Sequence, residues 1–252
     1  WEGLNEDLGA TAVWGSQQLG LFPGARFDGL FGIWYGKAPG VDRTGDVFKH
    51  ANAAGTSALG GVLAIIGDDH NCKSSTLPSQ SEFAMADAEI PVLNPASIQD
   101  VLDYGIHGWN MSRYSGAWTG LVALADTMDS GAVVNIDLDR FSFIAPSFHL
   151  PESGVHMRRG DTPLDKEARL RHFKLPAAQA YVRANRLDHV ILPSPKPRIG
   201  VIVTGQAARD VFEALAAIGL TPEEAGRLGL TIFKVAMPWP LEPEGVREFC
   251  AG

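Results

Sequence analysis

Four runs of mostly apolar residues predict buried β-strands. The runs cover residues 28–35, 61–67, 198–204 and 230–237. A strand that is covered on both faces loses the alternation of polar and apolar positions, so such runs are typical of central strands in parallel sheets. Residues 91–95 fit a further short strand, and residues 117–125 fit either a strand or a helix. We favour a strand for 117–125 because it continues the alternation of strands and helices.

Between these runs the apolar positions recur at helical spacing. The predicted helices cover residues 5–19, 46–57, 81–90, 97–113, 164–184, 206–218 and 221–228, and another begins after Pro243. Asn5, Ser97 and Thr221 stand at the starts of three of them as N-cap residues, whose side chains accept hydrogen bonds from the first turn. Helices that alternate with buried strands imply parallel sheets with helices on both faces.

The pattern divides the chain into two α/β domains joined by a linker. Residues 1–148 form the first domain, and residues 198–252 form the second. Residues 149–197 are rich in proline, arginine and aspartate and predict a linker with one packed helix. We therefore expect an α/β fold with two parallel-sheet, three-layer αβα domains. Because the chain opens without a methionine and stops within a helical pattern, we expect it to be part of a longer polypeptide.

Composition excludes several classes of partner. The net charge of −8 repels phosphate backbones, so we expect no nucleic acid partner. The sequence has neither a long apolar segment nor a signal peptide, so we expect no membrane association. Its two cysteines, Cys72 and Cys250, form no disulfide framework, which fits a cytoplasmic protein. The short basic stretches at 158–159 and 169–174 are interpreted as a solvated helix face.

The densest polar segment, residues 67–82, follows the strand at 61–67. Open α/β sheets bind ligands beyond the carboxyl ends of their strands, so we expect a functional loop here. Asp68, Asp69 and His70 suggest a metal site, but no second cluster completes a coordination sphere. We therefore predict no metal ligands in this chain.

Residues 36–46 form a second candidate segment, which we interpret as a glycine- and proline-containing loop. Its Lys37 and Arg43 carry charges that bind a phosphate or a carboxylate. Arg43 could equally brace the structure by pairing with Asp42 or Asp46, and the pattern leaves both alternatives open.

Four further residues carry titratable side chains. Glu6 lies in the first turn of a predicted helix, where a carboxylate is favourable, and the pattern alone favours simple capping. His50, His107 and His149 are isolated in the sequence, and we interpret them as structural histidines.

Several segments together resemble the fused indolepyruvate ferredoxin oxidoreductases, which are thiamine-diphosphate enzymes. The resemblance rests on Asn5–Leu8, Ala12–Gly15, Trp34–Arg43, Asp46–Asn52, Gly67–His70, Lys73–Thr76, Gln80–Glu82, Tyr104–Trp109, Arg198–Val201, Thr204–Gly205, Lys234–Val235 and Trp239–Pro243. The first group of motifs resembles the family's pyrimidine-binding domain. The motifs from Arg198 onward resemble its next domain, which is similar to the C-terminal domain of transketolases.

The resemblance implies oxidative decarboxylation of an aryl or related 2-oxoacid to an acyl-CoA, with electrons passing to ferredoxin. The implied cofactors are thiamine diphosphate, Mg²⁺ and iron–sulfur clusters, and the implied partners are the 2-oxoacid, coenzyme A and ferredoxin. By its place between Asn5 and Asp7, Glu6 matches the glutamate that bonds to the cofactor's aminopyrimidine ring and activates it. Glu6 is thus the expected catalytic and cofactor-binding residue.

The resemblance also implies further candidate site residues, and it shows that some features of the family are missing from this sequence. We expect Arg43, His50, Lys73, Ser74 and Ser75 near the substrate carboxylate or a domain interface. The family's first strand, its ligands for Mg²⁺ and the cysteines that hold iron–sulfur clusters are missing from this sequence.

We therefore expect the diphosphate-binding domain elsewhere in the same polypeptide, a homo-oligomer, and no activity from this chain alone. Two alternatives stay open, a non-catalytic interaction module and a thiamine enzyme of the transketolase type.

Overall fold

The computed structural model describes residues 3–72 and 76–252, and its larger sheet is parallel throughout. Its strands are β1 (Phe31–Lys37), β2 (Gly61–Asp68), β3 (Val92–Leu93) and β4 (Thr119–Leu124). They lie in the order β1-β2-β4-β3, so β1 forms one edge and β3 the other. The strand predicted at 117–125 is confirmed, while the one predicted at 28–35 begins three residues later.

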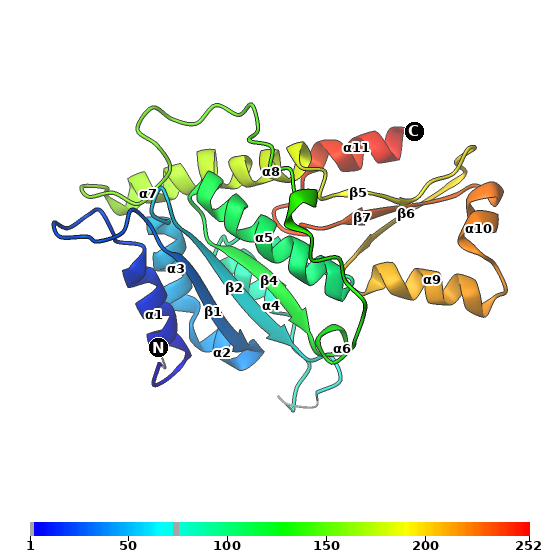
Figure 1. Cartoon of the computed structure of the whole chain (residues 1–252), viewed down its shortest axis with the longest axis horizontal. Helices are drawn as coiled ribbons and strands as arrows, with labels where there is room; N and C mark the ends of the chain where they lie inside the picture. Colours follow the sequence, from blue (N-terminus) through cyan, green and yellow to red (C-terminus); the bar gives the residue numbers. More distant parts are fainter. Residues whose placement is uncertain (1–2, 73–75) are drawn as a thin grey trace.

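Helices cover both faces of this sheet (Figure 1). One face carries α1 (Glu6–Ser16), α2 (Ala38–Arg43), α3 (Gly45–Ala54) and α4 (Ser81–Asp87), and the other carries α5 (Ile98–Ser115) and α8 (Leu175–Ala184). Val62, Ala64 and Ile66 of β2 point to the first group of helices, and Leu63 points to the second. This division explains why β2 is apolar at consecutive positions.

The predicted N-caps are formed as the sequence indicates. The side chain of Asn5 accepts from the amide of Leu8 at 2.9 Å, and that of Ser97 accepts from the amide of Asp100 at 3.1 Å. Thr221 closes a reciprocal capping box with Glu224. These local hydrogen bonds need only a few residues of sequence, so they can be predicted without tertiary information.

The second sheet is mixed, which differs from the expected parallel sheet. It contains β5 (His189–Leu192), β6 (Ile199–Thr204) and β7 (Leu230–Val235) in the order β5-β7-β6. β6 runs parallel to β7, whereas β5 runs antiparallel to it. In Figure 1, α9 (Ala207–Ala217) lies below this sheet, α11 (Pro243–Ala251) lies above it, and α10 (Pro222–Leu228) lies at its right-hand end. The α/β class is thus confirmed, with an antiparallel edge strand added.

The predicted linker at 149–197 contains more structure than expected. It holds α7 (Pro163–Arg169), a π-helical turn (Leu170–Lys174), α8 and β5. Pro176 lacks the N–H that would continue the α-helical pattern, and the amide of Leu175 bonds instead to the carbonyl of Leu170. The sequence pattern did not predict β5, because its four residues directly precede a proline-rich stretch. Between β4 and residue 149, where the whole segment is described, the helical elements are α6 (Ala125–Met128) and a 3₁₀ turn (Leu138–Arg140).

The basic stretch at 169–174 is not a uniformly solvated face, which corrects the sequence-based interpretation. Arg169 and Lys174 are buried. The Lys174 ammonium donates to the carbonyls of Asn52 and Ala53, each at 3.1 Å, where α3 ends. A cation at the C-terminus of a helix is favourable, so Lys174 ties the π-helical turn to α3. Charge patterning alone could not show this, because the acceptors lie about 120 residues away in sequence.

We expect the stability of the fold to rise with pH above neutrality because of Lys174. Burial lowers the pKa of its side chain from 10.5 to about 7. Between these values the unfolded chain binds more protons than the folded one, so the free energy of unfolding increases as pH rises from 7 towards 10. Urea unfolding of the native protein and of Lys174→Met at pH 7 and pH 9 measures this. The increase should be smaller in the variant, and an equal increase would contradict the assignment.

The second sheet joins the first at the β3 edge. The amide of Val92 donates to the carbonyl of Trp239 at 2.7 Å, and that of Asn94 donates to the carbonyl of Ala236 at 2.8 Å. Lys234 of β7 pairs with Asp100 in the first turn of α5. The segment after β7 therefore extends the edge of the larger sheet. Among the helices in the described ranges, none combines the length and hydropathy that crossing a bilayer requires.

Candidate functional site

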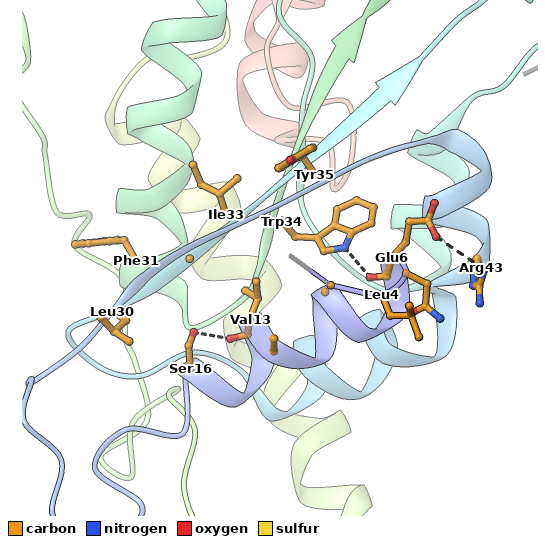
Figure 2. Close-up of a pocket in the computed structure, with 15 residues that line it drawn as sticks. Leu4, Glu6, Val13, Ser16, Leu30, Phe31, Ile33, Trp34, Tyr35 and Arg43 are labelled. Carbon is orange, nitrogen blue, oxygen red and sulfur yellow. Dashed lines mark hydrogen bonds and ion pairs between the residues drawn. The ribbon is translucent and has the colours of Figure 1, made fainter. Parts of the chain in front are cut away.

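A cavity of about 820 Å³ lies between α1 and the free edge of β1. Its walls come from residues 3–16 and 30–35 together with Arg43. Figure 2 shows Glu6 and Arg43 at one end of it and Leu30 and Phe31 at the other. The end with Glu6 lies beside α2, which directly follows the carboxyl end of β1. This is the edge at which open α/β sheets bind ligands.

Glu6 is held in place through its backbone. It is the first residue of α1, and the indole nitrogen of Trp34 donates to its carbonyl oxygen at 2.9 Å. Trp34 is only 4% exposed, because its ring packs against Phe48. The side chain of Glu6 stays 40% exposed and lines the cavity. Glu6 is therefore anchored at the backbone and presents a carboxylate to the open space.

Arg43 acts as a brace, although not with the partners expected from its sequence neighbours. Its Nε lies 3.0 Å from Oδ1 of Asp7, and its Nη1 lies 4.0 Å from Oε2 of Glu6 (Figure 2). The expected loop at 36–46 is mostly helical, because α2 begins at Ala38 and α3 at Gly45. Arg43 ends α2 and so faces the first turn of α1. The exposed position of the pair limits its energy to under about 1 kcal/mol.

The remaining lining of the cavity is largely apolar. Phe31, Ile33 and Tyr35 of β1 line the rim of the cavity and are exposed; Phe31 contacts Trp109 of α5, on the face of β1 opposite to Trp34. Val13 and Leu4 add aliphatic surface from α1 and the segment before it (Figure 2). A carboxylate beside apolar walls suits a flat heteroaromatic ring that carries a hydrogen-bonding nitrogen.

The polar segment at 67–82 lies at a different place. The buried carboxylate of Asp68 accepts from the amide and the hydroxyl of Ser81, at 2.8 and 2.6 Å, and so fixes the start of α4. Glu82 and His70 line a second cavity of about 370 Å³, together with Thr204 and other residues near the second sheet. Burial is the main cause that raises the pKa of Glu82. The described residues contain no group of three or more His, Cys, Asp or Glu that could hold a metal ion.

The other predicted candidates do not gather around Glu6. His50 is exposed, lies 3.6 Å from Asp46 and stacks against Trp14, outside the lining of the larger cavity. Lys73, Ser74 and Ser75 fall outside the described residues. Among the candidates that lie in the described residues, Glu6 and Arg43 are the two that the structure brings together.

The sequence alone does not indicate that Trp34 contacts Glu6. Trp34 lies 28 positions from Glu6 along the chain, and the alternation of β1 indicates only that this side chain is buried. No local signal identifies its hydrogen-bonding partner.

Three comparisons place the chain among known proteins. Residues 189–252 match the family model described as Indolepyruvate oxidoreductase domain. Over 234 residues, 90% of this chain, the sequence is 23% identical to Indolepyruvate oxidoreductase subunit IorA of Methanothermobacter thermautotrophicus, and the match covers 35% of that protein.

A solved structure is similar over 99% of this chain and 48% of its own, with a TM-score of 0.59 and 15% identity. It is the 2-oxoglutarate:ferredoxin oxidoreductase from Magnetococcus marinus with 2-oxoglutarate, coenzyme A and succinyl-CoA bound. This likeness shows a shared fold.

The chain thus spans about a third of the curated relative and about half of the solved structure. The family model covers the second sheet, the curated relative covers most of the chain, and the solved structure matches the arrangement of both sheets. The chain is thus similar in sequence to an indolepyruvate oxidoreductase domain and to an indolepyruvate oxidoreductase subunit, and it shares the fold of a 2-oxoacid:ferredoxin oxidoreductase.

Proposed function

We propose that this chain is the pyrimidine-binding part of a thiamine-diphosphate-dependent 2-oxoacid:ferredoxin oxidoreductase that acts on indolepyruvate or a related aryl 2-oxoacid. The observation that carries the proposal is the place of Glu6. Its carboxylate lines a cavity of about 820 Å³, and the end of the cavity that holds it lies beside α2, at the carboxyl end of β1. Thiamine diphosphate supplies the electron sink for decarboxylation when it is bound.

The residues present fit the aminopyrimidine half of that cofactor. The carboxylate of Glu6 suits a hydrogen bond to a ring nitrogen, and Leu4, which lines the same cavity, offers an apolar contact to the ring. The other half needs a cation for its diphosphate, and the described residues hold no group of three or more His, Cys, Asp or Glu that could bind one. We therefore propose that the diphosphate, Mg²⁺ and the iron–sulfur clusters are held by the remainder of a longer protein.

The chain's own residues have definite roles in this proposal. Glu6 accepts or shares a proton at one carboxylate oxygen and orients the ring. Trp34 fixes the backbone of Glu6, and Arg43 places a positive charge 4.0 Å from its carboxylate. The apolar lining excludes water from the ring face and strengthens the hydrogen bond made by the carboxylate.

Further partners belong to the same proposal. Coenzyme A would accept the acyl group and ferredoxin the electrons, in an assembly of more than one copy in the cytoplasm. The match to an indolepyruvate oxidoreductase subunit favours an aryl substrate. The second sheet, which matches the Indolepyruvate oxidoreductase domain, extends the edge of the first at β3, opposite the cavity.

We expect the chain alone to bind thiamine diphosphate weakly, because it lacks ligands for the diphosphate. Titration calorimetry with thiamine diphosphate and Mg²⁺ should give a dissociation constant above about 1 mM, a binding free energy weaker than about −4 kcal/mol. The native full-length protein should bind tightly under the same conditions. A dissociation constant near about 1 μM for the chain alone would contradict the divided site.

A non-catalytic interaction module is the second candidate function. The exposed apolar side chains on β1 favour it, because an uncovered edge strand suits contact with another polypeptide. Reduction of ferredoxin by the full-length protein with an aryl 2-oxoacid separates the candidates. Turnover supports the proposed enzyme, whereas no reduction with any 2-oxoacid favours the module or a transketolase-type enzyme.

A further inference from the structure

The side chain of Glu6 lies directly against the backbone of Gly40. A Cβ atom built on Gly40 would lie 2.6 Å from Cγ of Glu6 and 3.2 Å from its Cδ and Oε1. Real Cβ atoms essentially never approach another heavy atom to 2.6 Å, so the space of one methyl group at position 40 is filled by the stem of Glu6. Gly40 therefore forms the wall on which the carboxylate rests.

The backbone on both sides of this contact is fixed by other interactions. On the α1 side, Asn5 caps the helix and Trp34 holds the carbonyl of Glu6. On the α2 side, Gly40 is buried within a helix, and its carbonyl accepts from the hydroxyl of Thr44 at 2.6 Å. A methyl group added to Gly40 would therefore displace the flexible side chain of Glu6 before either helix moves.

The conformation of Gly40 gives no other reason for a glycine. It is helical, and its φ lies outside the left-handed region that favours glycine. In a helix interior alanine is normally more stable than glycine by about 0.5–1 kcal/mol. The contact with Glu6 is thus the feature of this position that alanine would disturb.

We propose that Gly40 is a positioning residue, whose missing side chain sets the place of the Glu6 carboxylate in the cavity. This inference rests on the proposed role of Glu6 towards the cofactor. α2 connects Gly40 directly to β1, and β1 lines the same cavity. The backbone of β1 and α2 thereby supplies the fixed surface against which the side chain of Glu6 rests.

Gly40→Ala in the full-length protein tests the proposal, with Gly45→Ala as the matched control. Gly45 begins α3, and a Cβ there would meet nothing within 4 Å. Crystal structures of both variants should show the carboxylate of Glu6 moved in Gly40→Ala and unmoved in Gly45→Ala. An unmoved carboxylate in Gly40→Ala would overturn the proposal, whatever the role of Glu6 proves to be.

Kinetics of the loaded enzyme give a second readout. We expect Gly40→Ala to lower kcat at least about tenfold, with KM for the 2-oxoacid nearly unchanged, because small misplacements of a catalytic group are costly. In a Glu6→Gln background the same change should have no further effect, since the group to be positioned is already lost. An equal loss of kcat in that background would show a general structural role and overturn the proposal.

Failure of the inference about Gly40 and failure of the proposed function can be told apart. If Glu6→Gln turns over normally, the proposed function fails, while the crystal structures still decide whether Gly40 sets the place of the side chain. If Gly40→Ala lowers the melting temperature, combining it with Glu6→Ala should restore that temperature, because alanine has no Cγ. A melting temperature that stays low would contradict the contact as the cause.

Discussion

Glu6→Gln in the full-length enzyme should lower kcat for 2-oxoacid-dependent ferredoxin reduction by at least about 100-fold, the low end of the contribution of a positioned acid–base group. Glutamine has nearly the same shape, so the contacts with Gly40 and the anchoring by Trp34 persist. The change removes the ability of the side chain to accept a proton. The loss should therefore appear without a change in melting temperature.

Asp7→Asn provides the matched control for this result. Asp7 neighbours Glu6 in the first turn of α1 and pairs with Arg43, but it does not line the cavity. Its kcat should fall by no more than about threefold, because an exposed ion pair is worth less than about 1 kcal/mol. Near-normal turnover in Glu6→Gln, or an equal loss of kcat in both variants, would rule out the proposed role of Glu6 in activating the cofactor.

Lys234→Met should cause the largest loss of stability, about 3 kcal/mol in the free energy of unfolding. Nζ of Lys234 lies 3.0 Å from both carboxylate oxygens of Asp100, and both side chains are largely buried. The ammonium also lies 5.3 Å from the ring centroid of Tyr104. Removing it leaves the carboxylate of Asp100 largely buried, with the amide of Ala96 as its remaining donor among the residues that the structure describes.

Urea denaturation of three variants measures this effect. Arg247→Met, which removes an exposed pair with Glu244, should change the free energy of unfolding by less than about 0.5 kcal/mol. Adding Asp100→Asn to Lys234→Met should recover much of the loss, because no charge is then left without a partner. A Lys234→Met protein as stable as the native one would contradict the expected contribution of this ion pair to stability.

The sequence predicts those parts of the fold that depend on local pattern. The apolar run at 61–67 becomes β2, and the caps at Asn5, Ser97 and Thr221 form as expected. These features depend on neighbours within a few positions. β5 was missed because its antiparallel pairing with β7 is set by contacts about 40 residues away.

The candidate site is predictable to a smaller extent, for the same reason. The resemblance identifies Glu6, but its partners Trp34, Gly40 and Arg43 lie 28 to 37 positions further along the chain. Arg43 pairs with Asp7 rather than with its sequence neighbours, because the end of α2 packs beside the start of α1. Such partners follow from the folded arrangement of helices and not from spacing.

The most direct measurement of the central claim is the exchange of the thiazolium C2 hydrogen of bound thiamine diphosphate for deuterium. It isolates proton removal from decarboxylation and electron transfer. NMR analysis of the quenched cofactor should show fast exchange in the native full-length enzyme and a rate near that of free cofactor in Glu6→Gln. Equal exchange rates in the two proteins would contradict the account.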